Sequence, residues 1–435
     1  MNKLFAIRHE DKYLMERRAS ITPIHAKKLI SNGLEMHVES SSKRVFKDSE
    51  YKSVGSTITH DISNCPVVFG VKEMPMSIFE EHKTYMFFSH TIKGQEYNMP
   101  LLKKMVEKKI NLIEYEKVAD EQNRRLIFFG RFAGLAGMIN SLWSYGLRLQ
   151  EKGIDNPFLK LKQSHKYNSL EEAKIDIKEV GRQIKEKGLP KSVQPMVIGI
   201  TGYGNVAKGA MEIADLLPIT EITPEELHDL NKNKNLPSNL VYRVTFKEKH
   251  ISKLKNGSKV FDLQDYYNHP EKYENQMEDY IPNLTILMNC MYWDSNYPRI
   301  VSKSFLKKLY KDKEPKLQVI GDVTCDPDGS IEATHKGTEI EDPIFVYNPD
   351  TDTPTMGAAG HGILIMAVDI LPSELPRDSS IAFGDALIDF AKDIITCDYK
   401  ASFKDLQLPA PIKKALILHN GEFTPDYKYM EEFIK

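Results

Sequence analysis

The sequence predicts an α/β protein of two domains, each built on a doubly wound parallel sheet with helices on both faces. The chain has 435 residues, which fits two or three domains of roughly 150 residues each. From the N-terminus onward, short apolar runs alternate with segments of helical composition, and this alternation is typical of a parallel sheet. A second strand–helix series starts near residue 196, after a charged and polar stretch over 151–195.

The composition is that of a globular protein with no nucleic-acid or membrane partner. Hydrophobic residues make up 41% of the chain and charged residues 28%, which allows a sizeable core and excludes a fibrous or disordered chain. Lys and Arg total 59 against 61 Asp and Glu, for a net charge of −2. This balance predicts no long-range attraction to nucleic acid or to anionic lipid. No apolar run approaches the roughly 18 residues of a membrane span.

The cysteines predict neither a disulfide framework nor a metal site. Cys65, Cys290, Cys325 and Cys397 lie far apart in the sequence, without a CxxC pair or a histidine at zinc spacing. We expect them to be buried small hydrophobic residues in a reducing compartment. Acidic residues follow the N-terminus within 11 positions, which argues against a signal or transit peptide and makes the cytoplasm the expected location.

The first strand–helix series begins with a strand at residues 4–8. A helix follows from Pro23 at its first position, with Thr22 as the N-cap. The remaining expected strands of this series are short apolar runs, and a helix precedes the last of them. The strands are residues 36–38, 67–71, 85–88 and 112–115, and the helix is residues 99–108.

The second series follows a long apolar helix expected over residues 131–150 and a polar helix over 170–187. Its first strand, at 196–201, runs directly into a glycine-rich turn. The elements expected after that turn are a helix from 205, strands at 241–246, 285–289 and 318–323, and an amphipathic helix in the Lys-rich segment 303–316. The apolar segment 362–371 then leads to a last helix at 381–395.

The glycine-rich turn is Gly202-Tyr203-Gly204-Asn205-Val206-Ala207, between a strand and a helix. Gly202 permits a tight turn, Gly204 lets a pyrophosphate approach the backbone, and Ala207 is small enough for close helix–strand packing. The helix N-terminus presents free N–H groups and a positive dipole end to the phosphates. The pattern therefore predicts a Rossmann-like dinucleotide site, with a plain strand–helix turn as the alternative.

Nucleotide choice is usually decided at the end of the next strand, about 20 residues after the glycines. That region here contains Glu221 and Thr223. Glu221 is suited to accept hydrogen bonds from ribose hydroxyls, which favours NAD. Thr223 carries no charge and would tolerate a 2′-phosphate, so these two residues alone leave the preference open.

Two titratable residues follow neighbouring apolar runs. Lys72 comes after 67–71 and His90 after 85–88, at the strand ends where ligands of open α/β sheets bind. A lysine and a histidine in such a place are suited to exchange protons with a substrate. The alternative is a surface lysine and a loop histidine. Glu73 and Glu116 stand beside apolar runs as candidate counter-charges for the lysine.

Arg18, near the first strand–helix connection, is suited to form a bidentate pair with a substrate carboxylate. Taken together, these residues predict a two-domain, nucleotide-dependent oxidoreductase whose proton-transferring groups lie on the domain opposite the nucleotide.

At these residues the chain resembles the lysine-forming saccharopine dehydrogenases. The resemblance is greatest to the lysine-ketoglutarate reductase half of the bifunctional aminoadipic semialdehyde synthases, within the alanine dehydrogenase superfamily. The matching stretches are co-linear and cover nearly the whole chain. They are ERRASITP (16–23), GVKEMP (70–75), TYMFFSHTIKGQEYNM (84–99), FFGRFAGLAGMI (128–139), ITGYGNVAKGA (200–210), NCMYWDSNYPR (289–299), GDVTCDPDGSIE (321–332) and VDILPSELPR (368–377).

The resemblance implies two Rossmann-like domains with an interdomain cleft. Residues 1–140 and 370–435 would form the substrate-side catalytic domain, and residues 141–369 the dinucleotide-binding domain. Lys72 matches the family's general base and His90 its acid. The matching substrate-contacting residues are Arg18, Gln95, Phe129, Tyr292 and Trp293. The matching dinucleotide-binding residues are Gly204, Asn205, Val206, Arg124, Met291, Val368, Asp369, Ile370 and Leu371, beside Gly202, Glu221 and Thr223 from the turn analysis.

The resemblance also implies an oxidoreductase acting on CH–NH, which condenses L-lysine with 2-oxoglutarate to saccharopine in lysine degradation. We expect NADPH to be the preferred cofactor, with NADH as the alternative, and no metal. Because the chain ends at Lys435, we expect no saccharopine-to-glutamate activity. The alternatives are an alanine-dehydrogenase-like amino-acid dehydrogenase and a catalytically silent amino-acid or nucleotide sensor. The sequence leaves the oligomeric state open.

Overall fold

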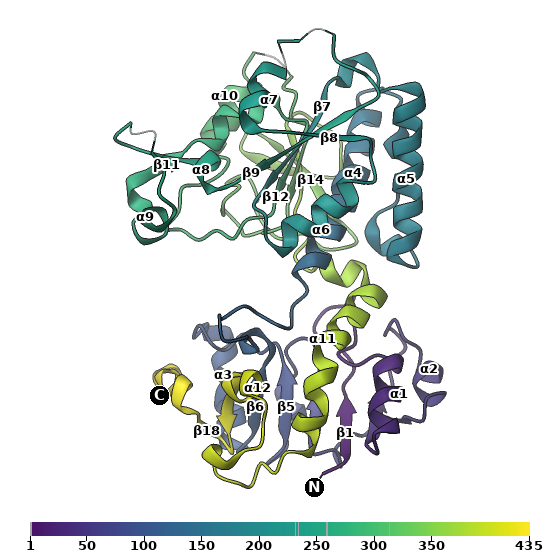
Figure 1. Ribbon diagram of the computed structural model, residues 1–435, viewed down its shortest axis with the longest axis vertical. Helices are drawn as coiled ribbons and strands as arrows, with labels where there is room; N and C mark the ends of the chain where they lie inside the picture. Colours follow the sequence, from purple (N-terminus) through teal and green to yellow (C-terminus); the bar gives the residue numbers. More distant parts are fainter. Residues whose placement is uncertain (1, 231, 234, 258–259, 313) are drawn as a thin grey trace. The chain divides into compact units, whose positions relative to one another are not determined.

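The computed structural model describes residues 2–230, 232–233, 235–257, 260–312 and 314–435. It divides into two compact units (Figure 1). Unit 1 comprises Met1–Phe129 and Pro376–Lys435, and unit 2 comprises Gly130–Leu375. Unit 2 is therefore an insertion in the chain of unit 1.

Unit 1 contains an eight-stranded sheet in the order β18-β17-β6-β5-β4-β1-β2-β3. Its strands are β1 (Leu4–Ile7), β2 (Glu35–Glu39), β3 (Thr57–Thr59), β4 (Val67–Phe69), β5 (Thr84–Phe87), β6 (Asn111–Glu114), β17 (Leu416–His419) and β18 (Glu422–Phe423). The strands from β1 to β6 run parallel, whereas β17 and β18 add to the edge in antiparallel fashion. The strand order reverses between β1 and β4, which is where open α/β sheets bind their ligands.

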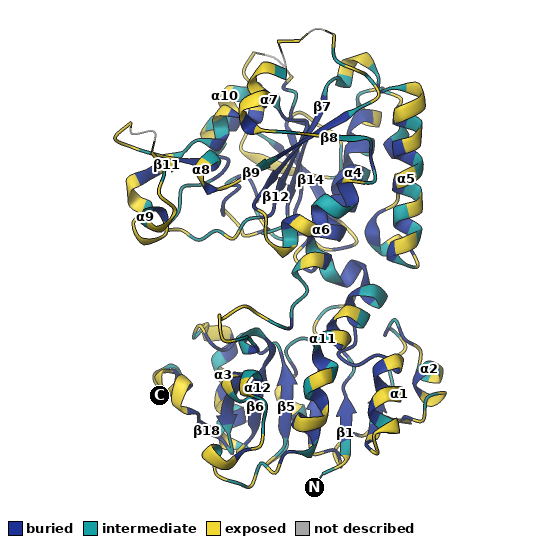
Figure 2. Ribbon diagram, in the orientation of Figure 1, coloured by how far each residue is buried: buried dark blue, intermediate teal, exposed yellow. Residues whose placement is uncertain are grey.

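Helices cover both faces of this sheet, because side chains alternate along each strand. The helices of unit 1 are α1 (Pro23–Ser31), α2 (Asp48–Lys52), α3 (Met99–Glu107), α11 (Pro376–Thr396) and α12 (Ala410–Ala415). Phe5 and Ile7 of β1 belong to a core with α1 and α11. Ala6, between them, belongs to a second core with α3. Figure 2 shows the strands as buried and the outer helix faces as exposed.

Unit 2 contains a second eight-stranded sheet, in the order β15-β14-β16-β13-β12-β7-β9-β8. Its strands are β7 (Met196–Thr201), β8 (Ile219–Ile222), β9 (Val241–Phe246), β12 (Ile286–Asn289), β13 (Val319–Asp322), β14 (Ile344–Asn348), β15 (Thr353–Met356) and β16 (Ile363–Met366). All pairs are parallel except those that β14 makes with β15 and β16. A separate antiparallel pair joins β10 (Ser252–Leu254) to β11 (Tyr273–Asn275).

The helices of unit 2 are α4 (Gly130–Glu151), α5 (Leu170–Lys187), α6 (Asn205–Ala214), α7 (Pro224–Leu230), α8 (Glu248–Ile251), α9 (Leu263–Asn268) and α10 (Lys303–Tyr310). Glycines let α4 and α6 pack unusually close together. A Cβ added at Gly134 would lie 1.8 Å from the carbonyl oxygen of Val206, and one at Gly209 would lie 2.1 Å from that of Arg131. This contact fixes the helix that follows the glycine-rich turn. On the opposite face, α7 and α10 share a core with β7, β9 and β12.

The predicted fold class is confirmed: both sheets are mostly parallel and lie between helices. The expected helix at 170–187 and the expected strand at 241–246 have the observed bounds. The Lys-rich helix ends earlier than expected, at Tyr310, ahead of Pro315. The order of strands beside β7 was not anticipated, since β9 lies between β7 and β8. None of the described helices is both long and apolar enough to cross a bilayer.

Candidate active site and nucleotide site

Lys72 and His90 both lie just beyond the carboxyl ends of central strands in unit 1. Lys72 follows β4 by three residues and His90 follows β5 by three. The strands β1, β4, β5 and β6 are consecutive neighbours in the sheet, so residues that follow them meet at one edge. Buried carboxylates stand at the same edge: Glu10 follows β1, and Glu114 ends β6.

Glu10 fixes the backbone turn that carries Lys72. Its Oε1 accepts a hydrogen bond from the backbone N–H of Val71 at 2.7 Å, and its Oε2 accepts one from that of Lys72 at 2.9 Å. Burial and the nearby charge of Glu16 raise the pKa of Glu10 to about 7. The ammonium of Lys72 lies 5.7 Å from the centre of the Tyr13 ring. Lys72, which is half-buried, therefore lies in a polar setting beside an aromatic ring.

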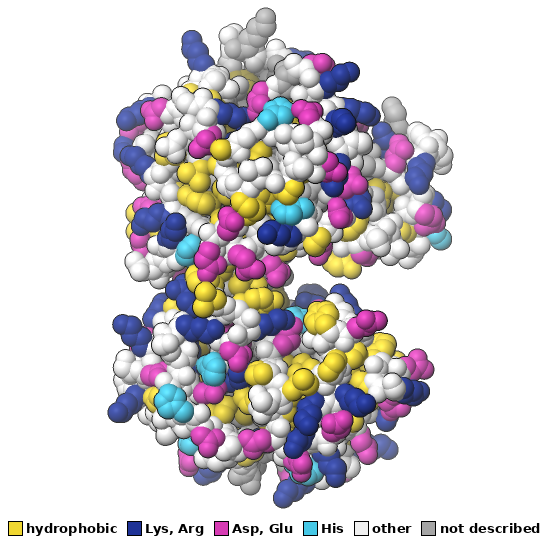
Figure 3. All heavy atoms as spheres, turned by 180° about the vertical axis from the view of Figure 1, so that it is seen from behind, with side chains coloured by type: hydrophobic (Ala, Val, Ile, Leu, Met, Phe, Trp, Pro, Cys, Tyr) yellow, Lys and Arg dark blue, Asp and Glu magenta, His cyan; other side chains and the backbone are white. Residues whose placement is uncertain are grey.

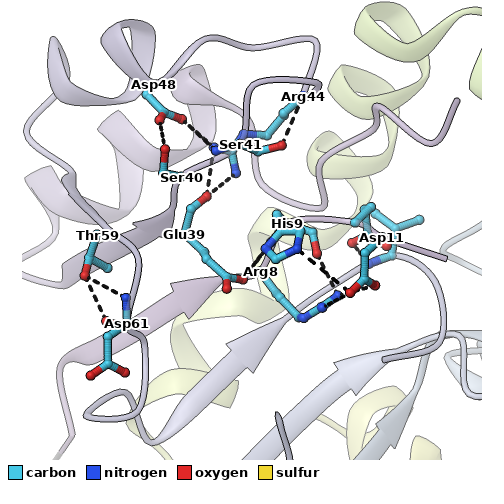
Figure 4. A network of polar contacts seen from close by, with 12 residues as sticks. Arg8, His9, Asp11, Glu39, Ser40, Ser41, Arg44, Asp48, Thr59 and Asp61 are labelled. Carbon is cyan, nitrogen blue, oxygen red and sulfur yellow. Dashed lines mark hydrogen bonds and ion pairs between the residues drawn. The ribbon is translucent and has the colours of Figure 1, made fainter. Parts of the chain in front are cut away.

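The loop leading to Glu10 is itself tied down by a polar network at the ends of β1 and β2 (Figure 4). Arg8 donates to Oδ1 of Asp11 at 2.9 Å, and the backbone N–H of His9 donates to Oε2 of Glu39 at 3.0 Å. The N–H of Arg8 also continues the pairing of β1 with β4 by donating to the carbonyl of Phe69 at 2.9 Å. These contacts hold the segment before Glu10 against the sheet edge.

His90 is oriented by Glu73. Its Nδ1 lies 2.8 Å from Oε1 of Glu73, and its carbonyl accepts a hydrogen bond from Nδ2 of Asn98 at 3.0 Å. The backbone of His90 has a φ of +51°, an uncommon conformation for a residue other than glycine. With Nδ1 engaged by the carboxylate, Nε2 is the ring nitrogen that can exchange a proton with a substrate.

Glu73 also accepts a hydrogen bond from Lys12. Burial opposes ionisation of Glu73, but the hydrogen bonds from His90 and Lys12 outweigh it and lower the pKa of this carboxyl to about 2. Glu73 is therefore ionised at neutral pH. The third acid of this edge, Glu114, accepts from the backbone N–H of Ser89 at 2.7 Å, and burial raises its pKa.

Arg18 forms a bidentate pair, but with a carboxylate of the protein. Its Nε and Nη2 donate to Glu16 at 2.8 and 2.6 Å. Its guanidinium lies 4.1 Å from the centre of the Phe129 ring, which in turn stacks on Phe383 at 4.5 Å. Burial opposes ionisation of Glu16, but the charges of Arg18 and Lys72 help to lower its pKa. Arg18 and Phe129 thus form one rigid element next to Lys72.

The two acids expected as counter-charges for Lys72 form ion pairs with other residues. Glu73 pairs with His90 and Lys12 instead, and Glu116 pairs with Arg125. The charge of Lys72 helps to lower the pKa of Glu16, after the larger effects of burial and Arg18. Sequence reasoning missed Glu10, Glu16 and Glu114 as parts of this site. An acid placed directly after or at the end of an apolar run was the available signal for Glu10 and Glu114.

Two further predicted residues of unit 1 lie on its surface. Gln95 is exposed and accepts a hydrogen bond from the hydroxyl of Tyr97 at 3.3 Å. Arg124 is exposed in a turn, where its Nε donates to Oδ2 of Asp120 at 2.7 Å. These side-chain hydrogen bonds of Gln95 and Arg124 are to residues of their own surface segments.

In unit 2 the glycine-rich turn has the geometry that a pyrophosphate needs. Gly202 has a φ of +85°, which glycine adopts readily. A Cβ added at Gly204 would meet no atom within 4 Å, so the space over this residue is open. The helix α6 begins at Asn205, and its N-cap residue, Gly204, has no side chain to cap the first turn. Its N–H groups and its positive dipole end are therefore free to face an anion.

A cavity of about 310 Å³ adjoins this turn. Its walls include Met291, which was predicted to contact the dinucleotide, and Tyr292 and Trp293, which were predicted to contact the substrate. The indole N–H of Trp293 donates to the carbonyl of Pro298 at 3.0 Å, whereas Tyr292 is 79% exposed. The segment Val368–Leu371 follows β16, and within it Asp369 is exposed.

The residues predicted to select the nucleotide lie on and after β8, and β9 separates this strand from β7. Glu221 belongs to β8, and its Oε2 accepts a hydrogen bond from Arg243 at 3.0 Å. Thr223 caps α7 by accepting from the backbone N–H of Glu226 at 3.2 Å. The prediction placed the selecting residues at the end of the next strand in the chain, which is β8. The strand that adjoins β7 on this side of the sheet is β9.

The remaining surface carries both signs of charge. Figure 3 shows lysine and arginine interspersed with aspartate and glutamate on the face that it presents. This agrees with the near balance of 59 basic and 61 acidic residues.

Two models of one protein family match successive parts of this chain. A family model described as alanine dehydrogenase/PNT, N-terminal domain, matches residues 6–136, and the corresponding C-terminal domain matches residues 181–426. A solved L-alanine dehydrogenase shares the fold, with a TM-score of 0.62 at 15% identity over 99% of this chain and 100% of that one.

Curated relatives are more similar in sequence. The alpha-aminoadipic semialdehyde synthase of Arabidopsis thaliana is 37% identical over 437 residues, which are 97% of this chain and 40% of that protein. The chain thus spans well under half the length of that relative. The L-lysine-forming, NAD(+) saccharopine dehydrogenase of Yarrowia lipolytica is 27% identical over 392 residues, which are 88% of this chain and 89% of that one.

Proposed function

The chain belongs to the alanine dehydrogenase/PNT family, and we propose that it is a lysine-ketoglutarate reductase. It condenses L-lysine with 2-oxoglutarate to saccharopine at the expense of a reduced nicotinamide dinucleotide. The observation that carries this proposal is the joint placement of Lys72 and His90 at adjacent strand ends, among buried carboxylates. The names of the similar aminoadipic semialdehyde synthase and lysine-forming saccharopine dehydrogenase support the choice of substrates.

The chemistry needs a proton acceptor and a proton donor. A free lysine side chain has a pKa of about 10.4 and is mostly protonated at neutral pH, so a base must take its proton before it can attack a ketone. Lys72 is the proposed base. Attack gives a carbinolamine, whose hydroxyl departs as water once His90 protonates it through Nε2. The product of these steps is an imine between the two substrates, which a hydride then reduces.

The protein's contribution to proton transfer is to hold both groups still. Glu10 anchors the backbone of Lys72 through two hydrogen bonds, and Glu73 fixes the ring of His90. A positioned general acid or base typically contributes about 100- to 10,000-fold to a rate. Such rigidity keeps the reacting atoms within hydrogen-bonding reach and so preserves that contribution.

Substrate carboxylates need cationic partners, and Arg18 is the one we propose in unit 1. Glu16 binds one edge of the Arg18 guanidinium, and the ring of Phe129 lies against its face. These two contacts fix the orientation of the guanidinium. Gln95 in unit 1, together with Tyr292 and Trp293 in unit 2, is proposed to complete substrate binding. These roles rest on the family resemblance of the stretches in which they lie.

The dinucleotide is proposed to bind at the glycine-rich turn, through Gly202, Gly204, Asn205 and Val206. When bound, it supplies the hydride that reduces the imine. The open space over Gly204 and the uncapped start of α6 fit its pyrophosphate. Further proposed contacts lie at Arg124, Met291 and Val368–Leu371. Thr223, one of the grounds for expecting NADPH, follows β8 and does not adjoin β7.

The test is to supply L-lysine, 2-oxoglutarate and each reduced nicotinamide in turn, and to follow the cofactor's absorbance. We expect oxidation that requires both substrates, with saccharopine identified by mass spectrometry. Oxidation that needs pyruvate and ammonia instead would favour the amino-acid dehydrogenase of the alanine type. Binding of lysine or nucleotide without turnover, in protein that is folded by circular dichroism, would favour a sensor.

A further inference from the structure

Glu248 is the acidic residue that follows the strand beside the glycine-rich turn. The strand β9 pairs with β7 along its whole length, so that Phe246 lies opposite Thr201. The pairing continues into the turn, where the N–H of Gly202 donates to the carbonyl of Phe246 at 2.8 Å. Glu248 comes two residues later and begins α8. It therefore occupies the place that sequence reasoning had assigned to Glu221.

Glu248 and the glycine-rich turn line the same cavity. Its walls include Gly202, Gly204 and Glu248, together with a group of aromatic side chains. The aromatic residues are Tyr203, Tyr266, Tyr267, Tyr292, Trp293 and Tyr297. Aromatic faces are the surfaces on which a nucleobase stacks, at about 1–3 kcal/mol for each base. A volume of about 310 Å³ is at the lower end of the usual range for small-molecule sites.

The carboxylate of Glu248 is buried and held in place. Its Oε1 accepts hydrogen bonds from the hydroxyls of Tyr203 at 3.4 Å and Tyr267 at 3.1 Å. The negative charge of Glu248 raises the pKa of the Tyr203 phenol, which keeps that hydroxyl a donor. A carboxylate offers about four acceptor positions. Two of them are used on Oε1, so capacity remains for the paired hydroxyls of a ribose.

We propose that this cavity binds the adenosine half of the dinucleotide, and that Glu248 selects the form with a free 2′-hydroxyl. The chain would then prefer NADH to NADPH. A 2′-phosphate brings a charge of about −2 towards a carboxylate that is only 8% exposed, where water screens the repulsion poorly. This inference rests on the proposed use of a nicotinamide dinucleotide by unit 2.

Lys247 is the opposing influence, because its charge would attract a 2′-phosphate. Its ammonium lies 5.7 Å from the centre of the Tyr203 ring, close to the same cavity. Lys247 is exposed, however, whereas Glu248 is buried. Exposed charges interact weakly through water, so the buried carboxylate should decide the preference.

Calorimetric titration of the full-length protein with NADH and with NADPH, without lysine or 2-oxoglutarate, tests the proposal. We expect NADH to bind at least about tenfold more tightly, the low end of what one hydrogen bond to a charged group contributes. The smaller probes adenosine 5′-diphosphate and adenosine 2′,5′-bisphosphate should compete in the same order. Equal or tighter binding of NADPH would overturn the proposal, as would the failure of both dinucleotides to bind.

Two variants assign the effect to Glu248. Glu248→Gln keeps the side-chain size and should reduce the preference for NADH about tenfold or more, by removing the charge. Glu221→Gln is the matched variant on β8, and it should leave the ratio of the two dissociation constants unchanged. If instead Glu221→Gln shifts the ratio of the dissociation constants and Glu248→Gln does not, Glu221 selects the nucleotide and the proposal for Glu248 is wrong. Circular dichroism checks that both variants are folded.

The role of Glu248 and the proposed reaction of the chain can fail independently of each other. Selective NADH binding with no turnover of lysine and 2-oxoglutarate would leave Glu248 as the selector and refute the lysine-ketoglutarate reductase. Turnover supported equally by both cofactors, with binding that does not distinguish them, would leave the reductase intact and refute the role of Glu248.

Discussion

Replacing Glu73 by Gln tests the idea that a buried carboxylate holds His90 ready for proton transfer. Gln has nearly the same size but no charge, and it cannot form an ion pair with Lys12 or with a protonated His90. In the native protein these two partners lower the pKa of Glu73 from 4.5 to about 2, against the effect of burial. At about 1.4 kcal/mol per pKa unit, this shift corresponds to about 3 kcal/mol of stability. Because Lys12 is 31% exposed, this is an upper limit.

The sign of the effect gives a pH dependence. A carboxyl whose pKa is lower in the folded than in the unfolded chain stabilises the fold above the unfolded pKa. That stabilisation is lost as the pH falls from about 4.5 towards about 2. We therefore expect the native protein to be more stable than Glu73→Gln at pH 7, and the difference to shrink as the pH is lowered through this window.

The same substitution should reduce turnover about tenfold, less than the loss of a general acid itself, because the amide oxygen can still accept from Nδ1 of His90. Urea unfolding of the full chain across the pH range measures the first effect, and steady-state kinetics the second. Glu81→Gln is the control, since Glu81 forms an exposed ion pair with Lys108 at 3.3 Å that should contribute little. If Glu73→Gln matches this control in both assays, Glu73 does not position His90.

Three other predictions follow from the two units. Lys72→Met and His90→Gln should each lower turnover by at least about 100-fold, with nearly unchanged binding of reduced nicotinamide. The double variant should lose far less turnover than the product of the two single losses. Near-normal turnover in both single variants would place the chemistry elsewhere. Gly204→Val should weaken dinucleotide binding more than about tenfold at an unchanged melting temperature, because a Cβ there meets only open space. Arg18→Met should raise the KM for a substrate that carries a carboxylate, and it should also lower stability because Glu16 loses its partner. Adding Glu16→Gln should restore the stability but leave the KM raised. Recovery of both would make Arg18 a structural residue.

Much of the fold could be predicted because its signals are local. The run at 241–246 and the helix at 170–187 are marked by residues within the segments themselves. The glycine-rich turn is a local signal too, because Gly202 and Gly204 meet conformational and spatial needs of the backbone. The placement of Lys72 and His90 after two apolar runs also required no knowledge of distant contacts.

The strand order could not be predicted because pairing is not local. Both β8 and β9 follow α6 in the chain, and either is able to pair with β7. The pattern of β9, Val241–Phe246, is longer and almost wholly buried, whereas β8 is exposed or half-buried along its length. A long buried strand belongs inside a sheet and a short exposed one at its edge. This contrast was the available evidence that β9, and so Glu248, lies beside the glycine-rich turn, which is why Glu248 and not Glu221 is proposed as the selecting acid.

The partners of the buried acids were equally hidden, and they explain how so many carboxylates coexist at one sheet edge. Glu10 is satisfied by backbone N–H groups, Glu73 by a histidine and a lysine, and Glu114 by Ser89. Removing a partner of an ionised buried carboxylate such as Glu73 leaves its charge uncompensated, which typically costs up to about 3–5 kcal/mol. The donors are therefore fixed in direction before any substrate arrives. Lys72 and His90 can therefore take part in a reaction without reorientation of the charged groups around them. A lysine and a histidine exposed to water would lose most of their effect to that reorientation.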